Sequence, residues 1–116
     1  MSRRTSAIKI WDAVTLAASS STTSAAVDIQ CAEAFALHVT AITGTSPAVA
    51  LTYSVAPALN GPYTIPQTPS GLGVSLSAAD VLAMEPEAAG AIKIIATNNG
   101  TGPVILTGYT VVIEAA

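Results

Sequence analysis

The chain has 116 residues, the size of one domain built around a single hydrophobic core. Only 9% of the residues are charged, compared with about 25% in ordinary globular domains, and the net charge is −3. This composition argues against nucleic-acid binding, which depends on clustered Lys and Arg side chains. Because 51% of the residues are hydrophobic and so few are charged, the surface is of the kind that other subunits commonly cover.

Targeting and redox signals are sparse. No stretch reaches the roughly 18 consecutive apolar residues of a membrane span, and Arg3 and Arg4 are not followed by the apolar segment of a signal peptide. The sequence therefore predicts a product made and kept in the cytoplasm, without a membrane partner. Cys31 is the only cysteine, so we expect a free thiol and no internal disulfide.

Residues 1–7 show no alternation of apolar and polar side chains, and we interpret them as a flexible N-terminal arm ahead of a β domain at 8–116. Docking of the arm on a neighbouring subunit through Arg3 and Arg4 is the alternative. Residues 8–16 alternate with a period of two and predict a first strand. Trp11 falls on its less apolar face, where it is a candidate interface anchor.

Two apolar segments, residues 35–42 and 49–55, also alternate with a period of two and flank a Gly-Thr-Ser-Pro reversal at 44–47. We predict that they form a β-hairpin around which the chain is organised. The alternation places His38 and Ile42 on the face turned away from the core.

A related reversal, Asn-Gly-Thr-Gly-Pro at residues 99–103, joins apolar segments at 92–97 and 104–114. Its likeness to residues 43–49 predicts a second hairpin, whose last strand is interrupted at Gly108. The chain thus contains a weak internal repeat of two similar strand pairs.

The remaining chain predicts a loop at 17–24, a short strand at 25–30 and a turn-rich stretch at 57–73. Residues 77–85 fit either an edge strand or helical turns that begin at a Ser-x-x-Asp capping box, and we favour the strand. Seven or eight short strands predict an all-β fold, a β-sandwich or jelly roll of antiparallel strands. The residues expected in its core are Phe35, Leu37, Val39, Leu51, Tyr53, Ile94 and Val112.

No catalytic, cofactor or metal site is predicted, and we expect a protein that is not an enzyme. His38 is the only histidine and lies in a strand, with no nucleophile motif around any Ser, so packing or hydrogen bonding is its expected role. Asp80, Glu85 and Glu87 match no calcium-loop spacing; we interpret them as a solvated acidic rim, with a Ca²⁺ site as the alternative. The Gly-x-Gly turns lack the lysine and helix of a phosphate-binding loop. Aromatic residues make up 4% of the chain, too few for a sugar-stacking platform.

Several segments of the chain resemble small β-sandwich structural proteins of tailed-bacteriophage virions. The segments that carry the resemblance are Ile8–Asp12, Ala26–Ile29, Phe35–Thr40, Gly44–Pro47, Leu51–Val55, Ile92–Gly100 and Leu106–Ile113. The resemblance implies a non-enzymatic virion protein that binds the major capsid protein or other virion proteins, as a trimer, and decorates or cements the assembled capsid. A head-to-tail or tail component is an alternative in the same class. A ligand-binding sandwich module, for example one that binds glycans, is the alternative from another class.

Overall fold

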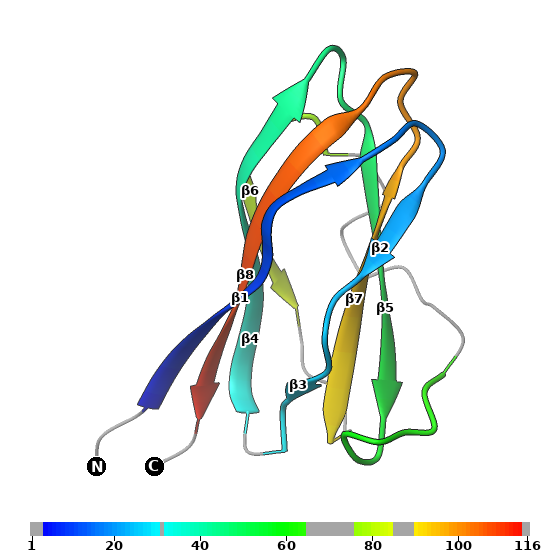
Figure 1. The fold of residues 1–116 in the computed structure, drawn as a ribbon. Helices are drawn as coiled ribbons and strands as arrows, with labels where there is room; N and C mark the ends of the chain where they lie inside the picture. The colour runs from blue at the N-terminus through cyan, green and yellow to red at the C-terminus, as the bar shows by residue number, and fades with distance from the viewer. Residues whose placement is uncertain (1–3, 31, 65–75, 85–89, 115–116) are drawn as a thin grey trace.

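A computed structural model of the chain describes residues 4–30, 32–64, 76–84 and 90–114. Every regular element in these residues is a β-strand, and the strands pair antiparallel (Figure 1). The strands are β1 (Arg4–Leu16), β2 (Ser21–Thr23), β3 (Val27–Asp28), β4 (Ala32–Gly44), β5 (Val49–Ala56), β6 (Asp80–Met84), β7 (Ala91–Asn98) and β8 (Val104–Glu114). This part of the chain forms no helix long and apolar enough to cross a membrane.

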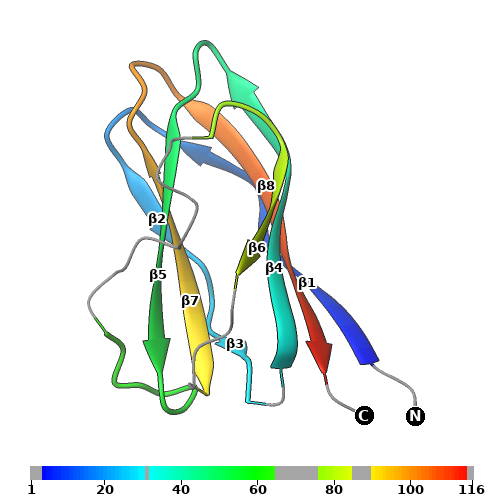
Figure 2. The same ribbon diagram turned by 180° about the vertical axis from the view of Figure 1, so that it is seen from behind.

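The strands form two sheets that face each other as a sandwich (Figures 1 and 2). Sheet A has four strands in the order β1-β8-β4-β6. In sheet B, β5 pairs with β7 along its whole length, while β2 and β3 pair with successive parts of β7. The predicted all-β sandwich is therefore confirmed.

The core lies between the sheets and follows from alternation along the strands. From Ile92 to Asn98 in β7 and from Val104 to Val112 in β8, every second side chain is buried while the residues between them are partly or fully exposed. Six of the seven side chains predicted for the core are buried, and Tyr53 is partly buried against it.

The two predicted hairpins are wrong, because in each case the two strands belong to different sheets. β4 pairs with β8 and β6 in sheet A, whereas β5 pairs with β7 in sheet B. Residues 45–48 and 99–103 therefore cross from one sheet to the other. Alternation shows which face of each strand is buried. It does not show whether two successive strands pair side by side as a hairpin or face each other from two sheets as an arch.

The two arches pack on each other at one end of the sandwich. The Asn99 N–H donates to the Ala48 carbonyl at 2.8 Å. A Cβ at Gly44 would lie 2.7 Å from the Pro103 carbonyl oxygen, so the close approach of the arches requires glycine there. The internal repeat therefore builds a pair of stacked arches.

Asn98 ties this end together with a buried side-chain amide. It is 0% exposed, and its nitrogen lies within hydrogen-bond distance of the carbonyls of Leu16 (3.1 Å), Ala17 (3.2 Å) and Gly102 (2.9 Å). Its oxygen accepts from the Gly100 N–H at 2.9 Å. Since Leu16 and Ala17 begin a third crossing, from β1 to β2, one side chain holds two crossings together.

The N-terminal arm predicted for residues 1–7 is wrong for the part that the structure describes. β1 begins at Arg4 and not at Ile8, and Arg4–Ala7 pair with β8 in continuous register. Alternation failed to show this because residues 4–7 have small or polar side chains that give no apolar pattern. The sheet edge reaches the start of the described chain.

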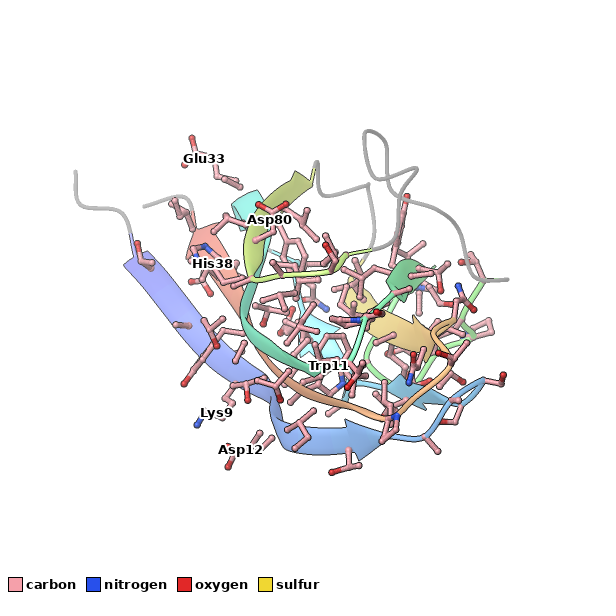
Figure 3. The ribbon with its side chains drawn as sticks, turned by 90° about the horizontal axis from the view of Figure 1, so that it is seen from above. Lys9, Trp11, Asp12, Glu33, His38 and Asp80 are labelled. Carbon is pink, nitrogen blue, oxygen red and sulfur yellow. The ribbon has the colours of Figure 1, made fainter. Side chains whose placement is uncertain are left out.

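Trp11 lies in the core, 2% exposed, and not on the exposed face predicted for it. The register with β8 shifts between Lys9 and Trp11 and again between Trp11 and Val14, which marks two bulges. Because an extra residue reverses the alternation beyond it, the indole turns inward, as Figure 3 shows. A Cβ at Gly108 would lie 3.0 Å from Trp11 Cε3, so Gly108 makes room for the ring and does not interrupt β8.

A register shift also places Ile42 on the inner face of its strand, not on the outer face predicted for it. β4 shifts against β8 between Val39 and Ala41, and Ile42 packs against the core, while His38 stays in the outer row as predicted.

The predicted loop at 17–24 contains β2, and the predicted strand at 25–30 is reduced to β3. The edge strand favoured for 77–85 is confirmed as β6, which pairs with β4 alone among the described strands.

Candidate interaction surface

The structure does not bring the predicted interaction residues together. Arg3 lies outside the described residues, Arg4 is placed only by its backbone in β1, and Trp11 is in the core. Cys31 and the segments that hold Glu85, Glu87 and the first Gly-x-Gly turn also lie outside them. Among the residues described, no group of His, Cys, Asp and Glu could hold a metal ion.

The outer face of sheet A is the broadest candidate surface. The strand register aligns its side chains in rows across the sheet, alternating with rows that point into the core. The outer rows are Thr5–Ile113–Ala34, Ala7–Val111–Ala36 and Lys9–Tyr109–His38–Val81. Ile105, 44% exposed, continues this face toward the arches. Lys9 is the only Lys, Arg, Asp or Glu residue in these rows.

Lys9 lies at the β1 edge of this face, where its ammonium interacts with two neighbours. Its Nζ is 5.4 Å from the centroid of the Tyr109 ring and 3.4 Å from Asp12 Oδ1. A hydrogen bond with the Tyr109 side chain, followed by the charge of Asp12, raises the pKa of Lys9 above its ordinary value of 10.5. The Lys9 side chain is exposed and stays charged at neutral pH, so it marks one edge of a face whose aligned rows hold no other Lys, Arg, Asp or Glu.

The outer face of sheet B is different, because hydroxyl side chains dominate it. The register places on this face Ser21, Thr23, Ala50, Thr52, Ser54, Lys93, Ile95 and Thr97. The loop after β5 covers part of it: Lys93 Nζ lies 4.4 Å from the Tyr63 ring centroid. Hydroxyl groups are readily solvated, so this face needs no protein cover.

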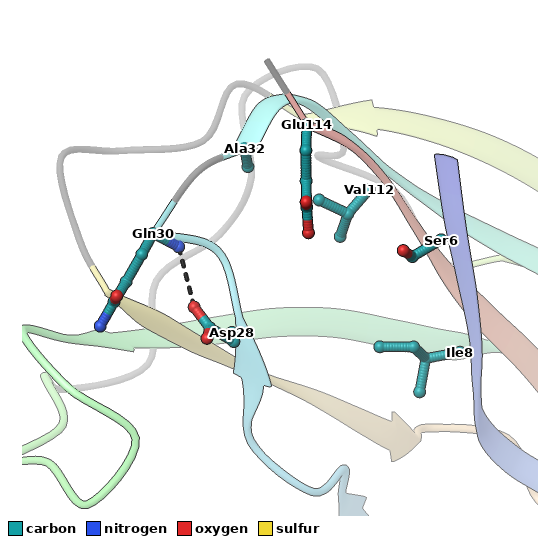
Figure 4. A pocket seen from close by; sticks show the side chains of 7 residues that line it. All are labelled: Ser6, Ile8, Asp28, Gln30, Ala32, Val112 and Glu114. Carbon is teal, nitrogen blue, oxygen red and sulfur yellow. Dashed lines mark hydrogen bonds between the residues drawn. The ribbon is translucent and has the colours of Figure 1, made fainter. Parts of the chain in front are cut away.

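A small depression opens between the sheets at the end where β1 begins and β8 finishes (Figure 4). Its volume is about 190 Å³, below the roughly 300–1,000 Å³ of typical small-molecule pockets. The residues that line it are Ser6, Ile8, Asp28, Gln30, Ala32, Val112 and Glu114. Such a site accepts a side chain of a neighbouring protein more readily than a whole ligand.

Sequence reasoning missed the outer face of sheet A, although a signal was present. Ile105, Val111 and Ile113 fall in the phase of β8 that alternates with the buried side chains. A strand that is apolar in both phases is typically covered on both faces. That signal identifies a surface to be covered, but not the partner that covers it.

Comparison with known proteins relates the chain by fold. No family model matches the sequence, and no curated protein sequence matches it either. The fold resembles that of VP2 from infectious bursal disease virus, solved as a subviral particle, with a TM-score of 0.66 and 11% identity. The match covers 97% of this chain and 33% of VP2, so the chain spans about a third of VP2's length.

A second similar structure is YomS, an SPBc2 prophage-derived protein. The TM-score is 0.53 at 15% identity, and the match covers 98% of this chain and 96% of YomS. At these identities the likenesses establish a shared fold alone. The sandwich thus occurs both within a larger viral protein and as nearly the whole of a prophage protein.

Proposed function

We propose that the chain is a non-enzymatic structural protein of a virion, of the tailed-phage type, that binds the assembled capsid and decorates or cements it. The observation that carries this proposal is the outer face of sheet A, an apolar surface with Lys9 as its single charged residue in the aligned rows. Large apolar patches on soluble proteins are typical of interaction sites. The fold shared with VP2 and YomS supports the choice of a viral assembly.

The proposal includes the partners and the location. The protein associates with the major capsid protein or other virion proteins and with further copies of itself, with a trimer as the stoichiometry that the phage resemblance implies. It needs no cofactor, nucleic acid or membrane. Many copies on one lattice multiply modest contacts into firm attachment.

The test is cosedimentation of the purified chain with capsids that lack decoration. We expect the wild-type chain to pellet with capsids and to remain in the supernatant without them. Val111→Lys should reduce the bound fraction, because it places a charge on the outer face of sheet A. Thr97→Lys is the matched control, since Thr97 is also partly buried in a central strand but lies on the outer face of sheet B.

Failure to pellet with capsids, together with saturable binding on a glycan array, would favour the glycan-binding alternative. The described aromatic residues give that alternative little support. Trp11 and Phe35 are buried in the core, and Tyr63 and Tyr109 each have a lysine over the ring. A head-to-tail or tail component is distinguished by electron microscopy of intact particles, which would locate the chain away from the capsid lattice.

A further inference from the structure

We propose that residues 4–9 of β1 are a docking site for an extended segment of another virion protein, which adds to sheet A as a fifth strand. The inference rests on the proposed function in taking that segment to belong to a virion protein. β1 lies at one edge of sheet A, since it pairs with β8 alone among the described strands. The unpaired N–H and C=O groups of an edge strand bind an extended main chain.

The edges of sheet B are short or already occupied in the described chain. β2 and β3 have only three and two residues. At the β5 edge, the Thr64 N–H donates to the Val55 carbonyl at 2.9 Å. Near the start of β5, Val49 exchanges hydrogen bonds of 3.0 and 2.8 Å with Leu76. Short strands and covered edges prevent pairing with other chains, so the described part of sheet B offers no long free edge.

The two edges of sheet A differ. β6 has five residues, and its Val81 N–H donates to the Asp80 carboxylate at 2.8 Å. β1 has 13 residues, and its register with β8 is continuous from Arg4 to Lys9, before the first of its two bulges. This stretch is about 20 Å long, the length of an ordinary strand. Residues 5–8 include no charged residue, proline or bulge, which are the features that protect many edge strands.

The inward side chains of this stretch also lack a neighbour. Ile8 belongs to the inward phase of β1, yet it is 45% exposed, because no described strand lies beyond it. Ser6 and Ile8 form the β1 side of the depression, and Asp28 lies across from them (Figure 4). Every second side chain of an added strand would point in the same inward direction. One aliphatic side chain of the segment would therefore pack on Ile8 at the depression, so the site selects a side chain as well as an extended main chain.

The distribution of charge favours a different protein over a second copy of this chain. Three of the four Lys and Arg residues, Arg3, Arg4 and Lys9, lie within the first nine positions. If the β1 strands of two copies paired, the cations of both would gather along one ribbon, and like charges across strands are destabilising. Arg4 and Lys9 stand at the two ends of the docking stretch. We therefore expect a segment with apolar residues in the phase of Ile8 and acidic residues at its ends.

The added strand extends sheet A sideways and does not cover its outer face. Strand addition at β1 is therefore compatible with the capsid contact of the proposed function. Substitutions can separate the two contacts, because Ile8 belongs to the inward phase of β1 whereas Val111 lies in the outer row that includes Ala7.

Hydrogen exchange followed by mass spectrometry tests the edge in the wild-type chain, alone and bound to capsids that lack decoration. In an edge strand, every second N–H has no strand partner and exchanges fast. We expect exchange over residues 5–9 to slow about 10-fold or more on binding, whereas exchange over β2, an edge of sheet B, should stay unchanged. Capsids that bind without slowing exchange in β1 would overturn the inference and leave the proposed function intact.

An array of overlapping peptides from the other structural proteins of the virion tests the same site without the capsid. The peptides have about 15 residues, longer than a typical strand. We expect the wild-type chain to bind a few of them. Ile8→Lys should raise the dissociation constant for those peptides about 30-fold or more, the size of a hot-spot substitution, with an unchanged circular dichroism spectrum. Leu59→Lys is the matched control, because Leu59 is 50% exposed but lies in the loop after β5.

Val111→Lys should leave peptide binding unchanged, because it alters the outer face and not the edge. No bound peptide, or equal effects of Ile8→Lys and Leu59→Lys, would overturn the inference. Loss of self-association in Ile8→Lys, measured by sedimentation velocity, with no peptide bound would show that the occupant is a second copy. Peptides that bind although capsids do not would uphold the edge and refute the capsid site. The exchange measurement uses the wild-type chain, so it decides the question even where Ile8→Lys does not fold.

Discussion

The two ends of the sandwich are held together in different ways. At the arch end, the chain crosses between the sheets at residues 17–20, 45–48 and 99–103, which lie together in Figure 1. The buried Asn98 side chain bonds to the first and third crossings, and the Asn99 N–H bonds to the second. This end is fixed by buried hydrogen bonds, which are costly to leave unmade.

At the terminal end, formed by residues 4–8, 28–30, 32 and 112–114, the sheets leave the depression between them. Ile8 is exposed there, and the Gln30 N–H donates to the carboxylate of the exposed Asp28 at 3.0 Å. Because Ile8 and Asp28 are exposed, a change at either residue disturbs few buried groups. The molecule thus separates the end that holds the fold from the end with surface free for association, and paired substitutions can test that separation.

The largest expected effect is that of Asn98→Asp. A carboxylate has no N–H to offer the carbonyls of Leu16, Ala17 and Gly102, and it would be a charge buried among acceptors. We expect a loss of about 4 kcal/mol or more in the free energy of unfolding, measured by urea denaturation. The reverse exchange at the terminal end, Asp28→Asn, should cost less than about 0.5 kcal/mol because Asp28 is exposed. Similar losses at both ends would contradict the comparison.

Next in size is the effect of truncating the core between the two ends. Leu37 is buried and His38 lies in the outer row of the same strand. Leu37→Ala should lower the free energy of unfolding by about 2–5 kcal/mol, because it leaves a cavity. His38→Ala should lower it by less than about 1 kcal/mol. Comparable losses in thermal denaturation would mean that both faces of β4 are equally packed in the isolated chain.

The buried phase of most strands could be predicted from the sequence. Phe35, Leu37, Val39, Ile94 and Val112 are in the core because alternation is a local property that survives in the fold. Alternation failed wherever a bulge inserts a residue, as it did for Trp11 and Ile42. A bulge depends on the partner strand, which the local pattern does not contain.

The partners of the strands could not be predicted in the same way. The two Gly-Thr-x-Pro reversals look like hairpin turns, and nothing local distinguishes a turn within one sheet from an arch between two. One contact that holds the arches is long-range: the buried amide of Asn98 bonds to a crossing some 80 residues earlier in the chain. The apolar residues in both phases of β8 could have predicted the outer face of sheet A in part. Which strands lie at the edges of the sheet follows only from the strand order in the structure.

A moderate effect is expected where the arches approach each other. Gly44→Ala would place a Cβ 2.7 Å from the Pro103 carbonyl oxygen and should cost about 1–3 kcal/mol by overpacking. Gly102→Ala is the control within the same end, since a Cβ there meets no atom within 4 Å. It should change the free energy of unfolding by less than about 1 kcal/mol, in either direction. Chemical denaturation of both variants measures the difference, and equal costs would show that the arches can separate freely.

The smallest effect is expected at the solvated contact of Lys9 with Tyr109, next to the terminal end. The hydrogen bond with the Tyr109 side chain is the main cause of the raised pKa of Lys9, so Tyr109→Phe should lower that pKa toward 10.5. Asp12→Asn should lower it less, because the charge of Asp12 is the second cause. Since the pKa is raised in the folded chain, its stabilising effect is present below pH 10.5 and is lost as the pH rises through the folded value. NMR titration of the lysine side chain measures both shifts. An unchanged pKa in Tyr109→Phe would show that the two side chains are not bonded in solution, whereas a marked loss of stability at neutral pH would show that the terminal end also holds the fold.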